Sequence, residues 1–158
     1  MKSRLNYIAA APKGYSAMIA LEQYVQNSGL EHSLLDLVKL RASQVNGCAF
    51  CIDMHWKDAR NAGESEERLY MLNAWPESPL YSDRERAALA LTEAVTLVSQ
   101  THVPDEVFAQ ARSHLSETEV VNLTLAIATI NSWNRLAITF RAEPGKYQPI
   151  RRNAVAST

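Results

Sequence analysis

The long apolar segment at residues 120–140 constrains the fold of this chain more than any other stretch. Its apolar side chains fall on more than one side of a helix, a pattern typical of a helix that is central or is covered by another subunit. The segment also contains Asn122, Asn131, Asn134 and Arg135. So many polar groups argue against a membrane span, because a bilayer offers them no partners. The segment therefore predicts a core helix and indicates an oligomer.

Helical spacing runs through the remainder of the chain as well. Ser82 with Glu85 and Ser116 with Glu119 have the spacing of capping boxes, and proline and glycine positions mark further helix ends. These signals predict seven helices, which begin near residues 12, 33, 48, 65, 83, 104 and 117. The fifth is expected to run from residue 83 to about residue 100. No segment alternates with period two, so we predict an all-α bundle of about seven helices.

The chain has 158 residues, a length that fits one domain. We expect residues 1–158 to form it, with a core at about 14–141 and a polar tail at 142–158 that is extended or disordered. The net charge is −1 and the 16 basic residues are scattered, without the basic stripe of a nucleic-acid-binding protein. The first residues lack the apolar run of a secretory signal. We therefore expect a soluble, cytoplasmic protein with neither a nucleic-acid nor a membrane partner.

Both cysteines of the chain lie in one short run, "NGCAFCIDMHW". On a helix that begins near Cys48, the side chains of Cys48, Cys51 and His55 share one face, since they occupy positions i, i+3 and i+7. The cysteines lie in the first turn, where unpaired N–H groups and the helix dipole stabilise a thiolate. His55 lies one turn after Cys51 and can act as a base or a cation. Asp53 points to another face and is expected to be solvated.

A metal site, a structural site and a redox site are the three interpretations of this motif. A structural zinc site requires four ligands, whereas Cys-x2-Cys-x3-His offers three, and His32, His102 and His114 are isolated. The cysteines can also pack as small apolar residues, with His55 as a satisfied core histidine. In a reducing cytosol, however, a Cys-x-x-Cys pair is more often catalytic or metal-binding than structural. The placement of both cysteines at one helix start favours redox catalysis.

The AhpD-like alkylhydroperoxidases, within the carboxymuconolactone decarboxylase superfamily, have a core motif that resembles "LVKLRASQVNGCAFCIDMH" in this chain. The similarity continues in "DARNAGESEERLYMLNAW", "DRERAALALTEAVT" and "LTLAIATINSWNRL", and covers residues 14–141. The resemblance implies an all-helical fold that assembles as homotrimers or homohexamers. It also implies a thiol-dependent peroxidase without a bound cofactor or metal. Such an enzyme acts on small organic hydroperoxides and is reduced by an external lipoylated or thioredoxin-like dithiol partner.

The resemblance assigns roles to individual residues. Cys51 attacks the hydroperoxide and becomes a sulfenic acid, and Cys48 resolves it as a disulfide. The position of Cys48 nearer the helix end favours Cys48 as nucleophile, whereas the neighbouring His55 favours Cys51, and we follow the resemblance. The proton relay of the family uses a glutamate twelve residues before the first cysteine, where this chain has Asp36. Ser33 and Asp36 also have capping-box spacing, so Asp36 either serves the relay or caps a helix.

Other functions remain open on the sequence. Superfamily membership also implies a lactone decarboxylase, although that chemistry does not need a Cys-x-x-Cys motif. A non-enzymatic, oligomeric redox sensor predicts a disulfide that forms once and does not turn over with any reductant. A disulfide reductase predicts turnover of a disulfide substrate in the absence of peroxide.

Overall fold

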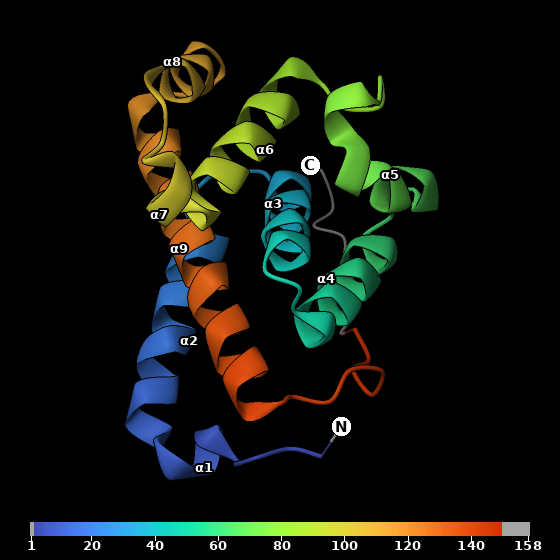
Figure 1. Cartoon of the computed structure of the whole chain (residues 1–158), viewed down its shortest axis with the longest axis vertical. Coiled ribbons are helices and arrows are strands. Elements are labelled where there is room, and N and C mark those ends of the chain that lie inside the picture. The colour runs from blue at the N-terminus through green and yellow to red at the C-terminus, as the bar shows by residue number, and fades with distance from the viewer. Residues whose placement is uncertain (1, 150–158) are drawn as a thin grey trace, which may run out of the picture.

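The computed structural model describes residues 2–149, which form helices and connecting loops without a strand (Figure 1). In chain order the helices of this part are α1 (Tyr7–Ala10), α2 (Pro12–Gln26), α3 (His32–Val45), α4 (Ala49–Asn61), α5 (Glu66–Met71), the 3-10 helix η1 (Leu72–Glu77), α6 (Asp83–Thr96), α7 (Val98–Thr101), α8 (Asp105–His114) and α9 (Glu117–Phe140). The predicted all-α class is confirmed. The sequence pattern does not predict the single-turn helix α1, because four residues leave no periodic signal, and it places α7 in the end of a longer helix.

The spacing predicts one continuous helix over residues 83–100, but the structure contains a break. Helix α6 ends at Thr96, and Leu97 leaves helical geometry with φ −100° and ψ 32°. The hydroxyl of Thr101 donates a hydrogen bond to the carbonyl of Ala94 at 2.6 Å. This bond satisfies a carbonyl in the last turn of α6, so a side chain beyond the break replaces a backbone partner.

Both predicted capping boxes form, at the N-termini of α6 and α9. Of the two alternatives for Asp36, the helix cap with Ser33 is wrong. Helix α3 begins at His32 with Glu31 as its N-cap residue, so Ser33 lies inside the first turn. Asp36 is only 4% exposed, and its carboxylate therefore belongs to the interior of the molecule and not to a helix end.

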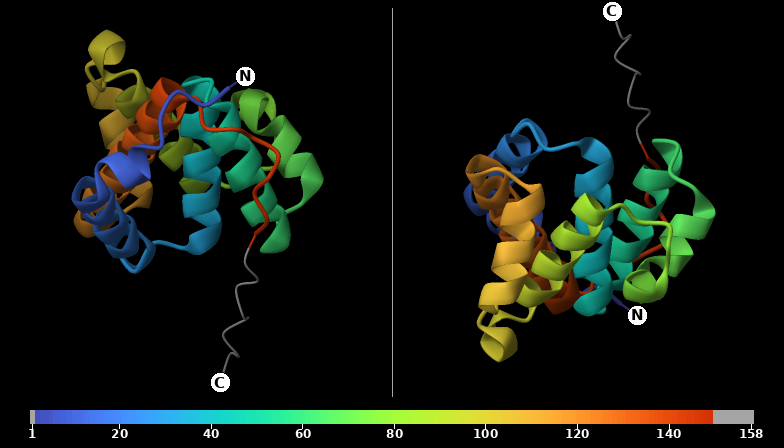
Figure 2. Two further views of the ribbon diagram at one scale, coloured as in Figure 1. Left: turned by 90° about the horizontal axis from the view of Figure 1, so that it is seen from below. Right: turned by 90° about the horizontal axis from the view of Figure 1, so that it is seen from above.

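Helices α3 and α9 form the centre of the bundle. Helix α3 packs against α4, α6 and α9, and α9 packs against α2, α3 and α6 (Figures 1 and 2). Much of the apolar girth of α9 is therefore covered within the chain, through side chains such as Leu123, Ile127 and Ile130. The oligomer stays a prediction from the resemblance. No helix within residues 2–149 combines the length and the apolar character that crossing a bilayer requires.

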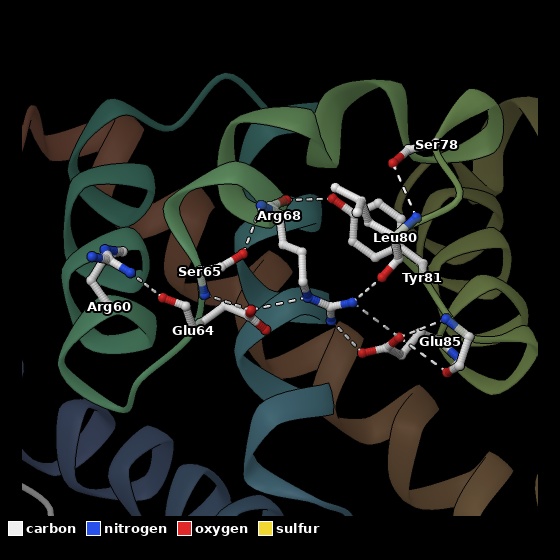
Figure 3. Close-up of polar contacts among 9 residues, drawn as sticks. Arg60, Glu64, Ser65, Arg68, Ser78, Leu80, Tyr81 and Glu85 are labelled. Carbon is white, nitrogen blue, oxygen red and sulfur yellow. Dashed lines mark hydrogen bonds and ion pairs between the residues drawn. The ribbon is translucent and has the colours of Figure 1, made fainter.

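Arg68 joins α5 to the start of α6 through a polar cluster (Figure 3). Its guanidinium donates hydrogen bonds to the carboxylates of Glu64 and Glu85, at 3.0 and 2.5 Å. It also donates to the carbonyl of Leu80 and lies over the ring of Tyr81, 5.0 Å from the ring centroid. These contacts hold α5 and η1 in place against the centre of the bundle, where η1 packs on α3.

The segment after α9 runs along α4 (Figure 1). The backbone N–H of Gly145 donates to the carboxylate of Asp53 at 2.9 Å, and the ammonium of Lys57 donates to the carbonyl of Gly145 at 3.3 Å. The sequence predicts a solvated Asp53. In the structure Asp53 instead anchors the segment after α9. Residues 142–149 contain no helix, and the other part of the predicted tail, 150–158, lies outside the described residues.

Candidate active site

The Asn46–Gly47 turn places the two cysteines at the start of α4. Gly47 has a φ of +66°, which glycine adopts readily and which lets the chain reverse between α3 and α4. Cys48 is the N-cap residue of α4, and Cys51 is the third residue of the helix. Both are free thiols and only 1% exposed. The two sulfurs are therefore shielded from bulk water at a helix N-terminus.

Each cysteine influences the charge of the other. The contact with the Cys51 thiol lowers the pKa of Cys48 to about 7 against the effect of burial, helped by the backbone N–H groups of Cys51 and Phe50 and by the Asn134 amide. The same contact, together with burial, raises the pKa of Cys51 well above its ordinary value. Two adjacent thiolates in a buried site would repel each other. Above about pH 7 the reduced pair therefore carries one negative charge, held mainly on Cys48.

This charge state has a measurable signature. A far-ultraviolet absorbance titration of the reduced protein is expected to show one thiolate per chain with a midpoint near pH 7, below the usual thiol pKa of 9.0. In the Cys48→Ser variant the midpoint should move to higher pH, because the remaining Cys51 thiol is buried and has lost its partner. A transition that stays near pH 7 in this variant would contradict the assignment of the low pKa to Cys48.

Buried amides of α9 hold the turn that leads into Cys48. Asn134 is completely buried: its Nδ2 donates to Ser43 Oγ at 3.1 Å, and its Oδ1 accepts from Asn46 Nδ2 at 2.8 Å. Asn46 also donates to Asn131 Oδ1 at 2.9 Å. From the sequence, Asn131 and Asn134 argue only against a membrane span. Their i, i+3 spacing within an apolar helix is the signal for a buried polar network.

Cys51 borders a cavity of about 390 Å³ between α2, α3, α4 and α9, which we call the Cys51 cavity. Its walls are largely aromatic and apolar and include Tyr7, Tyr15, Phe50, Met54 and Trp133. His55 and Asp36, 7% and 4% exposed, also border it. The structure therefore brings together three of the four predicted site residues in one hollow. The relay role of Asp36 stays a prediction, while its alternative role as a helix cap is excluded.

Cys48, the fourth predicted residue, does not line that cavity. It borders a surface groove of about 650 Å³ at the C-terminal end of α9, which we call the Cys48 groove. Phe50 and Ala137 line both the Cys51 cavity and the Cys48 groove, so the two hollows adjoin at these residues. Among the described residues, no three His, Cys, Asp or Glu side chains are arranged to hold a metal ion.

The Cys51 cavity also contains an ion pair that the sequence analysis does not identify. The ammonium of Lys39, 1% exposed, pairs with the carboxylate of Glu22. Glu22 also accepts hydrogen bonds from Gln26 at 3.1 Å and from the indole N–H of Trp133 at 3.2 Å. Lys39 lies three residues after Asp36 and thus on the same face of α3, which is the signal that could have placed it in the site.

The fold and the site together define an AhpD-like helical protein, with a buried Cys-x-x-Cys pair at a helix start beside a cavity that carries a histidine and an aspartate. The chain belongs to the carboxymuconolactone decarboxylase family, whose model matches residues 12–94.

Two similar proteins cover nearly the whole chain. The uncharacterized protein YdfG of Bacillus subtilis is 47% identical over 138 residues, which are 87% of this chain and 94% of YdfG. A crystal structure from Agrobacterium tumefaciens shares 48% identity with a TM-score of 0.90, and the match covers 92% of this chain and 100% of that one. That protein has no known function and is described as an AhpD candidate in antioxidant defence. The resemblance to AhpD-like proteins is therefore confirmed.

A more distant neighbour shows how far the fold extends. The debrominase Bmp8 has a TM-score of 0.80 at 20% identity, and the match covers 88% of this chain and 75% of Bmp8. At this identity the likeness concerns the fold alone.

Proposed function

We propose that the protein is a thiol-dependent peroxidase that reduces small organic hydroperoxides to alcohols. The observation that carries the proposal is the position of Cys51. Its side chain borders a largely apolar cavity together with His55 and Asp36, and its sulfur contacts a second cysteine one helical turn away. A nucleophile, acid–base groups and a resolving thiol are the components that this reaction requires.

The first step converts Cys51 to a sulfenic acid. The proton of Cys51 moves to the Cys48 thiolate, and the Cys51 thiolate attacks the terminal oxygen of the hydroperoxide. The O–O bond breaks, the terminal oxygen stays on Cys51 and the alkoxide leaves. The alkoxide takes up a proton and departs as the alcohol. His55 and Asp36 border the cavity and are the groups that we assign to this proton transfer.

The second step joins the two sulfurs. Cys48 attacks the sulfenic sulfur of Cys51, a disulfide forms and water leaves. Side chains at i and i+3 of a helix lie about 5–6 Å apart at Cβ, whereas a disulfide needs about 3.5–4.5 Å. A disulfide therefore requires a closer approach than two positions inside a regular helix allow. Cys48 is the N-cap residue with non-helical φ and ψ of −85° and 93°, so it can move without breaking the helix.

The walls of the Cys51 cavity favour an organic group on the substrate. Aromatic and apolar side chains such as Tyr7, Met54 and Trp133 cover the organic part of a hydroperoxide and remove it from water. The peroxide group then lies toward Cys51. An external dithiol, for which we propose a lipoylated or thioredoxin-like source, returns the disulfide to two thiols.

The test of this function is a thiol count and an intact mass after one equivalent of an organic hydroperoxide is added to the reduced protein. Loss of both thiols with a mass decrease of about two units, reversed by excess dihydrolipoamide, is the expected result. A thiol count that does not change after the hydroperoxide is added would contradict the peroxidase proposal. A disulfide that no dithiol reverses supports a redox sensor instead. Decarboxylation of carboxymuconolactone by a variant without either cysteine supports a lactone decarboxylase.

A further inference from the structure

The two cysteines of the pair border different hollows of the molecule. Cys51 borders the Cys51 cavity, and Cys48 borders the Cys48 groove. Phe50 and Ala137 line both hollows and separate them. A ligand in the cavity therefore lies beside Cys51, and a ligand in the groove lies beside Cys48.

The proposed reaction cycle requires access to the pair at two stages. In the oxidative half-reaction the hydroperoxide occupies the Cys51 cavity, beside His55 and Asp36. In the reductive half-reaction an external thiolate must reach one sulfur of the disulfide, and the rate depends on which sulfur is accessible. The groove gives access from the Cys48 side, which contains neither of these acid–base groups.

We propose that the reductant enters through the Cys48 groove and attacks Cys48, by a route separate from that of the hydroperoxide. The inference rests on the proposed function, because it assigns the second half-reaction of that cycle to its own site. The residues that form this site away from the Cys51 cavity are Ala49, Ile138, Arg141 and Glu143.

The groove fits a slender aliphatic dithiol arm. Cys48 is 1% exposed, so its sulfur lies below the surface that a globular protein contacts. The lining combines apolar groups such as Ala49 and Ile138 with Arg141 and Glu143, whose charges balance. Apolar walls suit a chain of methylene groups. A balanced pair of charges suits a reductant with an uncharged amide link better than a thiol compound that carries several charges. A dihydrolipoyl arm has these features.

The exchange balances as two thiol–disulfide steps. One thiolate of the arm bonds to the Cys48 sulfur, the Cys48–Cys51 bond breaks, and Cys51 leaves as a thiolate that takes a proton. The second thiol of the arm loses its proton and attacks the sulfur of the arm that is bound to Cys48. Cys48 leaves as a thiolate, and the arm leaves as a cyclic disulfide that has given up two electrons. During the first of these steps Cys48 carries no charge, so its repulsion of a Cys51 thiolate is absent.

The experiment separates the two routes by obstructing each in turn. Ile138→Trp places a bulky ring in the groove, Ile8→Trp places one at the Cys51 cavity, and Val121→Trp is the control. Ile138 and Val121 are on the same helix, 48% and 59% exposed, and Val121 borders neither hollow. The disulfide is prepared with diamide, so that reduction by dihydrolipoamide is measured without any peroxidase step. Oxidation by cumene hydroperoxide is measured separately on the reduced proteins.

We expect Ile138→Trp to slow reduction by dihydrolipoamide at least about tenfold and to leave the rate of oxidation by cumene hydroperoxide unchanged. Ile8→Trp should slow this oxidation and leave the rate of reduction unchanged. Val121→Trp should match the unsubstituted protein in both. Ala49→Leu, which also narrows the groove, repeats the test if Ile138→Trp folds poorly. Unchanged reduction in the groove variants overturns the inference even if the protein is a peroxidase. If cumene hydroperoxide oxidises none of the proteins, the peroxidase proposal fails, while the reduction rates still locate the thiol route.

The identity of the dithiol is a second outcome of the same experiment. Reduced thioredoxin is compared with dihydrolipoamide on the diamide-oxidised protein. Faster reduction by dihydrolipoamide, with sensitivity to Ile138→Trp, supports a slender arm in the groove. Faster reduction by thioredoxin that is insensitive to Ile138→Trp overturns this choice of occupant.

Discussion

Cys51→Ser is expected to lower hydroperoxide turnover by at least about 10³-fold, because a serine hydroxyl is not ionised near neutral pH and is a poor nucleophile. Cys51 is 1% exposed and small, and serine has nearly the same shape, so the loss reports chemistry and not misfolding. The measurement is hydroperoxide consumption with excess dihydrolipoamide, with the circular dichroism spectrum as the control for folding.

Cys48→Ser provides the matched comparison, since it changes the other sulfur of the same pair. Without a resolving thiol, Cys51 should react once with the hydroperoxide and gain one oxygen atom, about 16 mass units, as a sulfenic acid. Turnover should then stop. The opposite pattern, with a single reaction in Cys51→Ser and none in Cys48→Ser, would assign the attack to Cys48. The lowered pKa of Cys48 makes this a real competitor, so the two variants decide between the sulfurs.

Helix starts were predictable from the sequence where a local rule acts alone. The boxes at Ser82 and Ser116 form because each serine is followed by a glutamate three residues later and nothing competes for the helix start. The same spacing at Ser33 and Asp36 fails, since α3 begins at His32. Asp36 is drawn into the interior by the packing of α3, and no local rule contains that information.

The separation of the two cysteines was beyond a sequence argument. Helical spacing predicts that Cys48 and Cys51 share one face of a helix, but Cys48 is the N-cap residue of α4 with non-helical φ and ψ. The two cysteines nevertheless border different hollows, and Phe50 of α4 and Ala137 of α9 line both. These two residues are 87 positions apart in the chain, and their place in one apolar cluster depends on how α9 packs against α4. Spacing grouped Cys48, Cys51 and His55, and the resemblance added Asp36, but neither predicts that two different hollows border the cysteines.

Glu22→Gln is expected to lower the free energy of unfolding by about 3–5 kcal/mol, since it breaks a largely buried ion pair while leaving the other charge in place. Lys39 is 1% exposed, and the Glu22 carboxylate is its anionic partner. Glutamine keeps the size of the side chain, but its single carbonyl oxygen replaces only one of the two oxygens that accept from Gln26 and Trp133, so the variant removes the charge and one hydrogen bond. Chemical denaturation of the reduced protein measures the change.

The pH dependence of stability tests the same pair. Burial opposes ionisation of Glu22, but the charge and hydrogen bond of Lys39 outweigh it and hold the pKa of Glu22 below 4.5 in the folded protein. A depressed folded pKa contributes stability that is present above the unfolded value and is lost as the pH falls through the folded value. The difference between the unsubstituted protein and Glu22→Gln should therefore be largest near neutral pH and narrow below about pH 4.

A double variant separates the cost of an unpaired charge from the strength of the pair. Glu22→Gln combined with Lys39→Met should be more stable than Glu22→Gln alone, because no ammonium remains without its carboxylate. Glu117→Gln is the control, since Glu117 is 88% exposed and lies 3.3 Å from Arg112, where an ion pair contributes about 1 kcal/mol or less. If Glu22→Gln costs no more than this control, the pair does not stabilise the fold. Its position in the wall of the Cys51 cavity would then point to a role in the chemistry of Cys51.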